Sequence, residues 1–150
     1  MELNGETLRF IREHCKDDVR SLALQAPKYP GVDMSVALTQ IAGRQAAAEK
    51  IPSWHEEEGV LYPRHLSLEQ CSSEATARYK ASIIPESSSG TLTDLTGGFG
   101  IDCAFLSPKF HHVTYVERQE VLCEIASHNF PLLGLNHIQI ENKDGIRHLQ

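Results

Sequence analysis

The stretch TLTDLTGGFGID, from Thr91 to Asp102, constrains the fold of this chain more than any other part of its sequence. An alternating, β-branched run ends on an acid, passes through Gly97, Gly98 and Gly100, and continues as the start of a helix. Glycines directly after a strand let the backbone approach a ligand closely, and the following helix presents free N–H groups. The G-x-G-x-x-G spacing of a dinucleotide loop is absent. The glycine stretch is therefore compatible with two interpretations: a ligand-binding turn, or a tight turn that binds no ligand.

The residues after this stretch alternate between strand-like and helix-like patterns. Strands that alternate with helices imply a parallel sheet wound by right-handed crossovers. We therefore predict an α/β chain that ends in the first half, three strands, of a Rossmann-like fold. The predicted elements are strands at Thr91–Thr96, His112–Glu117 and Ile138–Glu141, a helix start at Ile101–Leu106 and a helix at Gln119–Leu133.

The residues before this region have a helical pattern. Helices are predicted in ETLRFIREH and DDVRSLALQ, and a longer one begins at the N-cap Asp33 and stops at Pro52. The stretch SWHEEEGVLYPRH is predicted to be a loop, and SLEQCSSEATARYKASII a further helix that is interrupted near Ser72 and Ser73. We predict a helical amino-terminal domain over residues 1–84, a linker over 85–90 and a partial Rossmann-like domain over 91–150.

Charge and cysteine usage argue against several kinds of site. The formal net charge is −6, so the chain lacks the basic face of a free-standing nucleic-acid binder, although a local basic patch leaves an RNA substrate open. The cysteines at positions 15, 71, 103 and 123 form no C-x-x-C pair, and we predict no metal site. No apolar run approaches the roughly 20 residues that span a bilayer, and the amino terminus lacks a signal pattern. We expect a cytoplasmic protein with no membrane partner.

An acid stands at the end of each predicted strand. Asp94 lies near the end of the first strand, Glu117 closes the second, and Asp144 follows the third in NKDG. Alone, each would more often be a helix cap or a surface acid. Open α/β sheets bind ligands at the carboxyl edge, where all of these acids are expected to meet. At that edge, an acid after the second strand can accept both hydroxyls of a ribose, and one after the third could accept an adenine amine.

These residues resemble those of a known family. DLTGGFGID, YVER and NKDG resemble motifs I, II and III of class I S-adenosylmethionine-dependent methyltransferases. The T-x-G-x-G-x-D form, with ER after the second strand, is similar to bacterial small-subunit ribosomal RNA guanine-N2 methyltransferases. Upstream, QCSSEATARYKA resembles the helix before motif I in cap trimethylguanosine synthases and in bacterial methyltransferases with a carboxyl-terminal THUMP-like domain, the best overall match. The resemblance covers residues 70–150.

The resemblance implies a set of contacts to the methionine portion of S-adenosylmethionine. Asp94 would hold the ammonium, Ser72 would face the carboxylate, and Asp102 would lie beside the cofactor. The backbone of the glycine turn would lie against the same portion of the cofactor. The residues of that turn are Thr96, Gly97, Gly98 and Gly100.

The resemblance also implies contacts to the adenosine portion. Glu117 would bind the ribose hydroxyls and Asp144 the adenine amine. Gly145 would keep the approach to the base open, and Arg118 would flank the adenine pocket.

The family would transfer a methyl group to an exocyclic base nitrogen of RNA, with guanine N2 favoured. Its base-gripping motif follows a fourth strand, and this sequence stops at GIRHLQ, before that motif. We therefore expect an amino-terminal fragment that is inactive alone, with unknown catalytic residues beyond Gln150. The alternative is a non-catalytic helical interaction module fused to a degenerate nucleotide-binding fold. A dehydrogenase is disfavoured, because it would need the G-x-G-x-x-G spacing that this sequence lacks.

The fourth strand of the family would pair beside the first. Without it, the strand at Thr91–Thr96 would lie at a sheet edge, and exposed edges recruit partners. We expect the fragment to form a homodimer through this edge or the surface beside it. The alternative is that the amino-terminal helices fold back over the edge.

Overall fold

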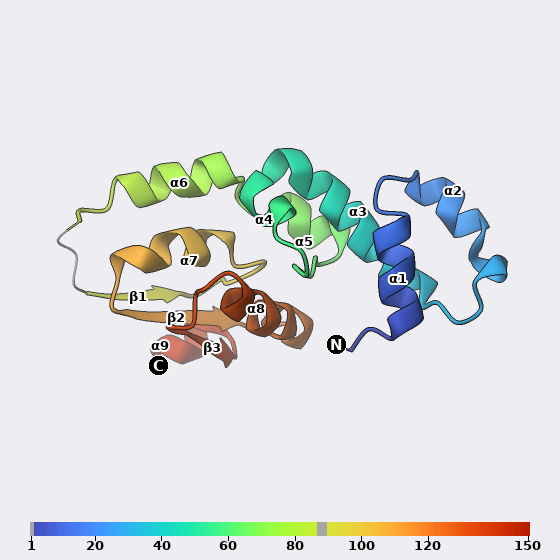
Figure 1. The fold of residues 1–150 in the computed structure, drawn as a ribbon. Helices are drawn as coiled ribbons and strands as arrows, with labels where there is room; N and C mark the ends of the chain where they lie inside the picture. Colours follow the sequence, from blue (N-terminus) through green and yellow to red (C-terminus); the bar gives the residue numbers. More distant parts are fainter. Residues whose placement is uncertain (1, 87–89) are drawn as a thin grey trace.

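The computed structural model describes residues 2–86 and 90–150, and Figure 1 shows an elongated molecule with the first helices at one end and the sheet at the other. The helical first part contains α1 (Gly5–Glu13), α2 (Val19–Leu24), the 3₁₀ turn η1 (Ala26–Lys28), α3 (Met34–Lys50), α4 (Pro52–Glu56), α5 (His65–Gln70) and α6 (Glu74–Ser82). The second part contains β1 (Thr91–Asp94), α7 (Ile101–Leu106), the 3₁₀ turn η2 (Ser107–Lys109), β2 (His112–Glu117), α8 (Glu120–Leu132), β3 (Ile138–Asn142) and α9 (Gly145–Leu149).

Side-chain caps fix where several of the helices begin. Asp33 accepts a hydrogen bond from the backbone N–H of Val36 and starts α3, which confirms the predicted N-cap. Ser73 caps α6 in the same way, through the N–H of Thr76. The chain therefore breaks between α5 and α6, at the place where the predicted helix over 67–84 was expected to be interrupted.

The predicted loop at 53–65 is wrong in its first part, because α4 occupies Pro52–Glu56. A proline at the first position of a helix loses no hydrogen bond, so Pro52 both ends α3 and begins α4. Trp54 is 3% exposed, and its burial holds this short helix in place. The acidic run that suggested a loop begins only at the end of α4.

The helix α3 belongs to two hydrophobic clusters. Its first half packs with α1 and α2 through Phe10, Leu22 and Ile41. Its last turns contribute Ala47 to the main core, which continues into the sheet. The first two helices are therefore attached to the rest of the molecule mainly through α3, in agreement with their position in Figure 1.

The strands form one parallel sheet in the order β1-β2-β3. Thr91 pairs with His112 and Val113 with Ile138, so the carboxyl ends of the strands lie at one edge. Figure 1 shows α7 over the sheet and α6 over α7. The fold class is confirmed: a helical region is followed by three strands of a Rossmann-like methyltransferase fold.

The main core joins the helical region to the glycine turn. Phe99, in the turn, packs edge-on against Trp54 with ring centroids 5.1 Å apart, and also contacts Tyr62. Phe99 therefore packs the turn against residues of the first part of the chain. The predicted linker at 85–90 includes residues 87–89, which lie outside the described residues.

Two buried amides clamp the segment around Leu61 between the two parts of the chain. Asn129 of α8 accepts from the N–H of Leu61 at 2.9 Å and donates to its carbonyl at 2.8 Å. Gln40 of α3 makes the same pair of bonds to Tyr62, at 2.8 and 2.9 Å. Both backbone groups of each residue are thereby satisfied inside the protein.

Two further properties concern the whole described chain. No helix within residues 2–86 and 90–150 is long and apolar enough to cross a membrane. The four cysteines are free thiols, and burial raises the pKa of Cys103 to about 12, so this thiol stays protonated at neutral pH.

Candidate functional site

The parallel register brings the strand-end acids to one edge of the sheet. Asp94 is the last residue of β1, Glu117 is the last residue of β2, and Asp144 follows β3 by two residues. A pocket of about 510 Å³ lies at this edge. Its lining residues are Leu95, Thr96, Glu117, Arg118, Gln119, Asp144, Gly145, Ile146 and Leu149. Five of the predicted site residues therefore lie around one pocket.

Glu117 is fixed in this pocket by the backbone. Its side chain accepts from the N–H of Gly98 at 3.0 Å through one oxygen and from the N–H of Gln119 at 2.8 Å through the other. The residue is only 8% exposed, and these bonds compensate for the burial of its charge. A carboxylate held in this way has lone pairs left for a ligand hydroxyl. The bond to Gly98 also links the pocket directly to the glycine turn.

Asp144 is both a pocket residue and a helix cap. Its Oδ1 accepts from the N–H groups of Ile146 and Arg147, at 2.9 and 3.3 Å, and starts α9. A Cβ at Gly145 would overlap the carbonyl oxygen of Leu95, so the glycine is needed for α9 to lie against the end of β1. Asp144 is therefore the helix cap that the sequence left open, and it also lines the pocket.

The glycine turn lies on aromatic rings from β2 and α8. A Cβ at Gly97 would overlap the ring of Tyr115, and one at Gly100 would overlap Phe130. Gly98 and Gly100 have φ values of 55° and 90°, which residues with a side chain rarely adopt. The hydroxyl of Tyr115 donates to the carbonyl of Gly98 at 2.5 Å. Packing alone thus accounts for the glycines at 97 and 100, while a Cβ at Gly98 would meet only the carbonyl oxygen of Thr96, at an ordinary contact distance of 3.5 Å.

Asp94 ends β1 by binding its own turn. Its Oδ1 accepts from the N–H of Thr96 at 3.0 Å, so the strand stops two residues before the predicted end. Burial raises the pKa of Asp94 from its ordinary value of 3.8, against the opposing effect of the Thr96 bond, and the nearby charges of Asp102 and Glu117 raise it further. Three acids therefore act on one another at this end of the site.

Asp102 lies under α6 in a cluster that reaches back to the upstream helix. Its Oδ2 accepts from the hydroxyl of Ser72 at 3.0 Å and from Nζ of Lys80 at 2.9 Å. Its Oδ1 is buried and has no hydrogen-bond partner among residues 2–86 and 90–150. The structure thus brings Ser72 and Asp102 together, although neither lines the 510 Å³ pocket.

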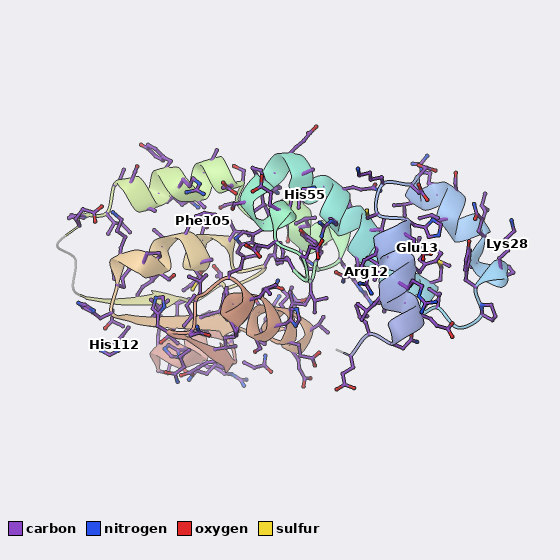
Figure 2. The ribbon with its side chains drawn as sticks, viewed as in Figure 1. Arg12, Glu13, Lys28, His55, Phe105 and His112 are labelled. Carbon is purple, nitrogen blue, oxygen red and sulfur yellow. The ribbon has the colours of Figure 1, made fainter. Side chains whose placement is uncertain are left out.

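Lys80 is a residue of this cluster that the sequence analysis missed. It stands three residues after the buried Ala77 on α6, so both lie on the face that packs on α7. That spacing is the signal that could have identified it. Figure 2 shows the side chains between α6 and α7, where Phe105 is labelled.

The arrangement supplies groups for a polar organic ligand. Carboxylates at the strand ends can accept hydrogen bonds from hydroxyl and amine groups, and the exposed side chains of Ile146 and Leu149 offer apolar surface beside them. Within the described part of the chain, no group of three or more His, Cys, Asp or Glu side chains is placed to hold a metal ion.

The fold and the strand-end acids define a Rossmann-like domain of the methyltransferase type, of which residues 90–150 form three strands. The sequence matches no protein-family model and no curated protein. Among solved structures, a "putative methyltransferase" from Porphyromonas gingivalis W83 is similar to 99% of this chain, with 28% identity and a TM-score of 0.75. This chain spans 38% of the length of that protein.

A second solved structure, an rRNA methylase from Streptococcus thermophilus, is similar over a smaller region. It covers 51% of this chain and 46% of its own, at 20% identity and a TM-score of 0.42. The similarity to the Porphyromonas protein covers the helical region of this chain as well as its sheet, so that protein also combines a helical region with such a sheet.

Proposed function

We propose that this chain carries the S-adenosylmethionine-binding half of a methyltransferase that acts on RNA, with guanine N2 as the favoured target. One observation carries the proposal: acids from the ends of all three strands lie at one edge of a sheet whose fold is that of a methyltransferase. Open α/β sheets bind nucleotide ligands at this edge.

The adenosine portion of the cofactor fits the pocket. Glu117, held by two backbone N–H groups, would accept the ribose hydroxyls. Asp144, which caps α9 through Oδ1, would accept a hydrogen bond from the adenine amine through its other oxygen, and Arg118 lies exposed at the rim of the same pocket. Ile146 and Leu149 would cover part of the base.

The methionine portion fits the glycine turn. Asp94 and the unpartnered oxygen of Asp102 are acceptors for the ammonium group. Gly98 has no side chain and is not tightly packed, so the methionine portion of the ligand would lie against its backbone. When bound, S-adenosylmethionine would supply a methyl group on a sulfonium centre, and holding a nucleophile in line with it can contribute about 7–11 kcal/mol. We assign no residue of this chain to that step.

The RNA substrate is supported by sequence motifs. DLTGGFGID with YVER is similar to ribosomal RNA guanine-N2 methyltransferases, and QCSSEATARYKA is similar to the THUMP-like-domain group. The net charge of −6 means that the basic contacts to RNA would have to come from a local patch or from another part of the protein.

Two measurements test the proposal. Calorimetry with S-adenosylhomocysteine should show saturable binding by the full-length protein, and undetectable binding by that protein at millimolar ligand would instead support the non-catalytic interaction module. Radiolabelled S-adenosylmethionine should transfer its methyl group to structured RNA and not to free guanosine. Transfer to protein or to small molecules while RNA stays unlabelled would overturn the RNA assignment.

A further inference from the structure

Lys80 lies where α6, α7 and the glycine turn meet. Its Nζ donates to Oδ2 of Asp102 at 2.9 Å and to the hydroxyl of Ser72 at 3.1 Å. The side chain of Lys80 is 44% exposed and that of Asp102 34% exposed, so the ion pair is open to solvent on one side. A ligand could therefore reach these groups without unfolding α6.

The hydrogen bonds of this cluster are unevenly distributed. Oδ2 of Asp102 has two donors, whereas its buried Oδ1 has none among the described residues. A buried acceptor without a donor costs free energy, and native proteins satisfy nearly all such groups. Oδ1 of Asp102 is therefore an acceptor that a donor group of a ligand can satisfy.

The charges of the cluster favour a ligand group with both signs. Asp94 and Asp102 lie close enough for their charges to interact, and Lys80 is a cation in direct contact with Asp102. An ammonium group would be attracted by the two acids. A carboxylate on the same ligand would be repelled by them unless it met a cation and a hydroxyl, and Lys80 and Ser72 are such a pair.

From this geometry we infer that Lys80, together with Ser72, binds the carboxylate of the cofactor's amino-acid portion, while Asp102 turns its free oxygen to the ammonium. The inference rests on the proposed function. Lys80 is paired with Asp102, and with the cofactor bound it would be shared between Asp102 and the ligand carboxylate. Lys80 is thus a binding residue that distinguishes ligands with an amino-acid group from those without one.

The test compares two ligands on matched variants of the protein. S-Adenosylhomocysteine carries the amino-acid group, and 5′-methylthioadenosine has the same nucleoside and thioether without it. Lys80→Met should weaken binding of S-adenosylhomocysteine by about 10- to 100-fold, the range of a lost charge-assisted hydrogen bond, and leave 5′-methylthioadenosine within about twofold. Lys80→Arg should recover part of the loss.

Arg78→Met is the control, because it removes a cation from the same helix without touching the cluster. Arg78 pairs with Glu74 at 3.0 Å and lies 4.9 Å from the centre of the Phe105 ring, so its loss should change neither affinity. Equal weakening of both ligands by Lys80→Met, or no weakening, overturns the inference and leaves the proposed function standing. If the unmodified protein binds neither ligand, the proposed function itself fails, and the inference with it.

Discussion

The two ends of the candidate site differ in the groups that already bind their acidic side chains. At the adenosine end, Glu117 is held by backbone N–H groups and faces a pocket of about 510 Å³. At the methionine end, Asp102 is in contact with the chain's own Lys80 and Ser72. A carboxylate oriented by backbone is ready for a ligand, whereas one paired with a flexible lysine must exchange partners. Ligand binding should therefore need rearrangement at the methionine end and little at the adenosine end.

The largest expected effect is at Glu117, because both classes of ligand need the adenosine end. Glu117→Ala should weaken S-adenosylhomocysteine and 5′-methylthioadenosine alike by about 100-fold, or about 3 kcal/mol, since the ribose loses its acceptor and the N–H of Gly98 loses its partner. Isothermal titration measures both constants. Glu120→Ala, which removes an exposed acid three residues further on, serves as the control. Unchanged affinity for both ligands would show that the pocket does not hold the ribose.

A smaller and selective effect is expected at Asp94. Asp94→Asn should weaken S-adenosylhomocysteine by about 10- to 30-fold and leave 5′-methylthioadenosine unchanged, because only the first ligand carries an ammonium group. Asparagine keeps an oxygen for the N–H of Thr96, so the turn itself should persist. If both ligands are weakened equally, the two ends of the site do not act separately.

The raised pKa of Asp94 predicts a pH dependence that is confined to one end. Burial, together with Asp102 and Glu117, raises this pKa above its ordinary value of 3.8. An ammonium group binds the ionised form, so affinity for S-adenosylhomocysteine should increase as the pH rises from 3.8 through the raised pKa. In the free protein the sign is opposite: the contribution of Asp94 to stability is complete below 3.8 and is lost as the pH rises through the raised pKa.

Titrations at a series of pH values check this dependence. The curve for 5′-methylthioadenosine should be flat over the same window, and Asp94→Asn should flatten the curve for S-adenosylhomocysteine. A slope that survives in the variant would assign the dependence to another group.

The smallest expected effect concerns the free edge of the sheet. Within the described chain, β1 pairs with β2 on one side only, and Thr91 and Thr93 remain exposed. We propose a weak homodimer through this edge, which sedimentation equilibrium at micromolar concentration would detect. Thr93→Lys should abolish it, since charged edge residues prevent strand addition. A monomer with β1 amides protected from hydrogen exchange would mean that another part of the protein covers the edge.

The sequence predicted the elements whose patterns are local. The strand at His112–Glu117 and the helix start at Ile101–Leu106 have the predicted bounds, because alternation and helical spacing are complete within each segment. The first strand is shorter than predicted, since the side chain of Asp94 captures the N–H of Thr96. The helix α4 was missed because its stability comes from burial of Trp54 against Phe99, a contact between residues far apart in sequence.

The distinction between local patterns and contacts that depend on packing also applies to the site. Asp94, Glu117 and Asp144 could be placed at one edge because strand direction alone determines where strand ends lie. Lys80 could not be placed in the same way, since its contact with Asp102 depends on how α6 packs on α7. The resemblance to known methyltransferases supplied roles for Ser72 and Asp102, and the structure adds that they touch each other.

The edge-on contact between Phe99 and Trp54 makes the helical region a thermodynamic partner of the glycine turn. If opening of α4 disturbs the turn, a ligand that stabilises the turn must make that opening less favourable by the same factor by which the opening weakens ligand binding. Trp54 lies outside the glycine turn and the 510 Å³ pocket. Affinity for the ligand can therefore be tuned by changes in a helix that carries none of the predicted site residues, with no change in the ligand's own contacts.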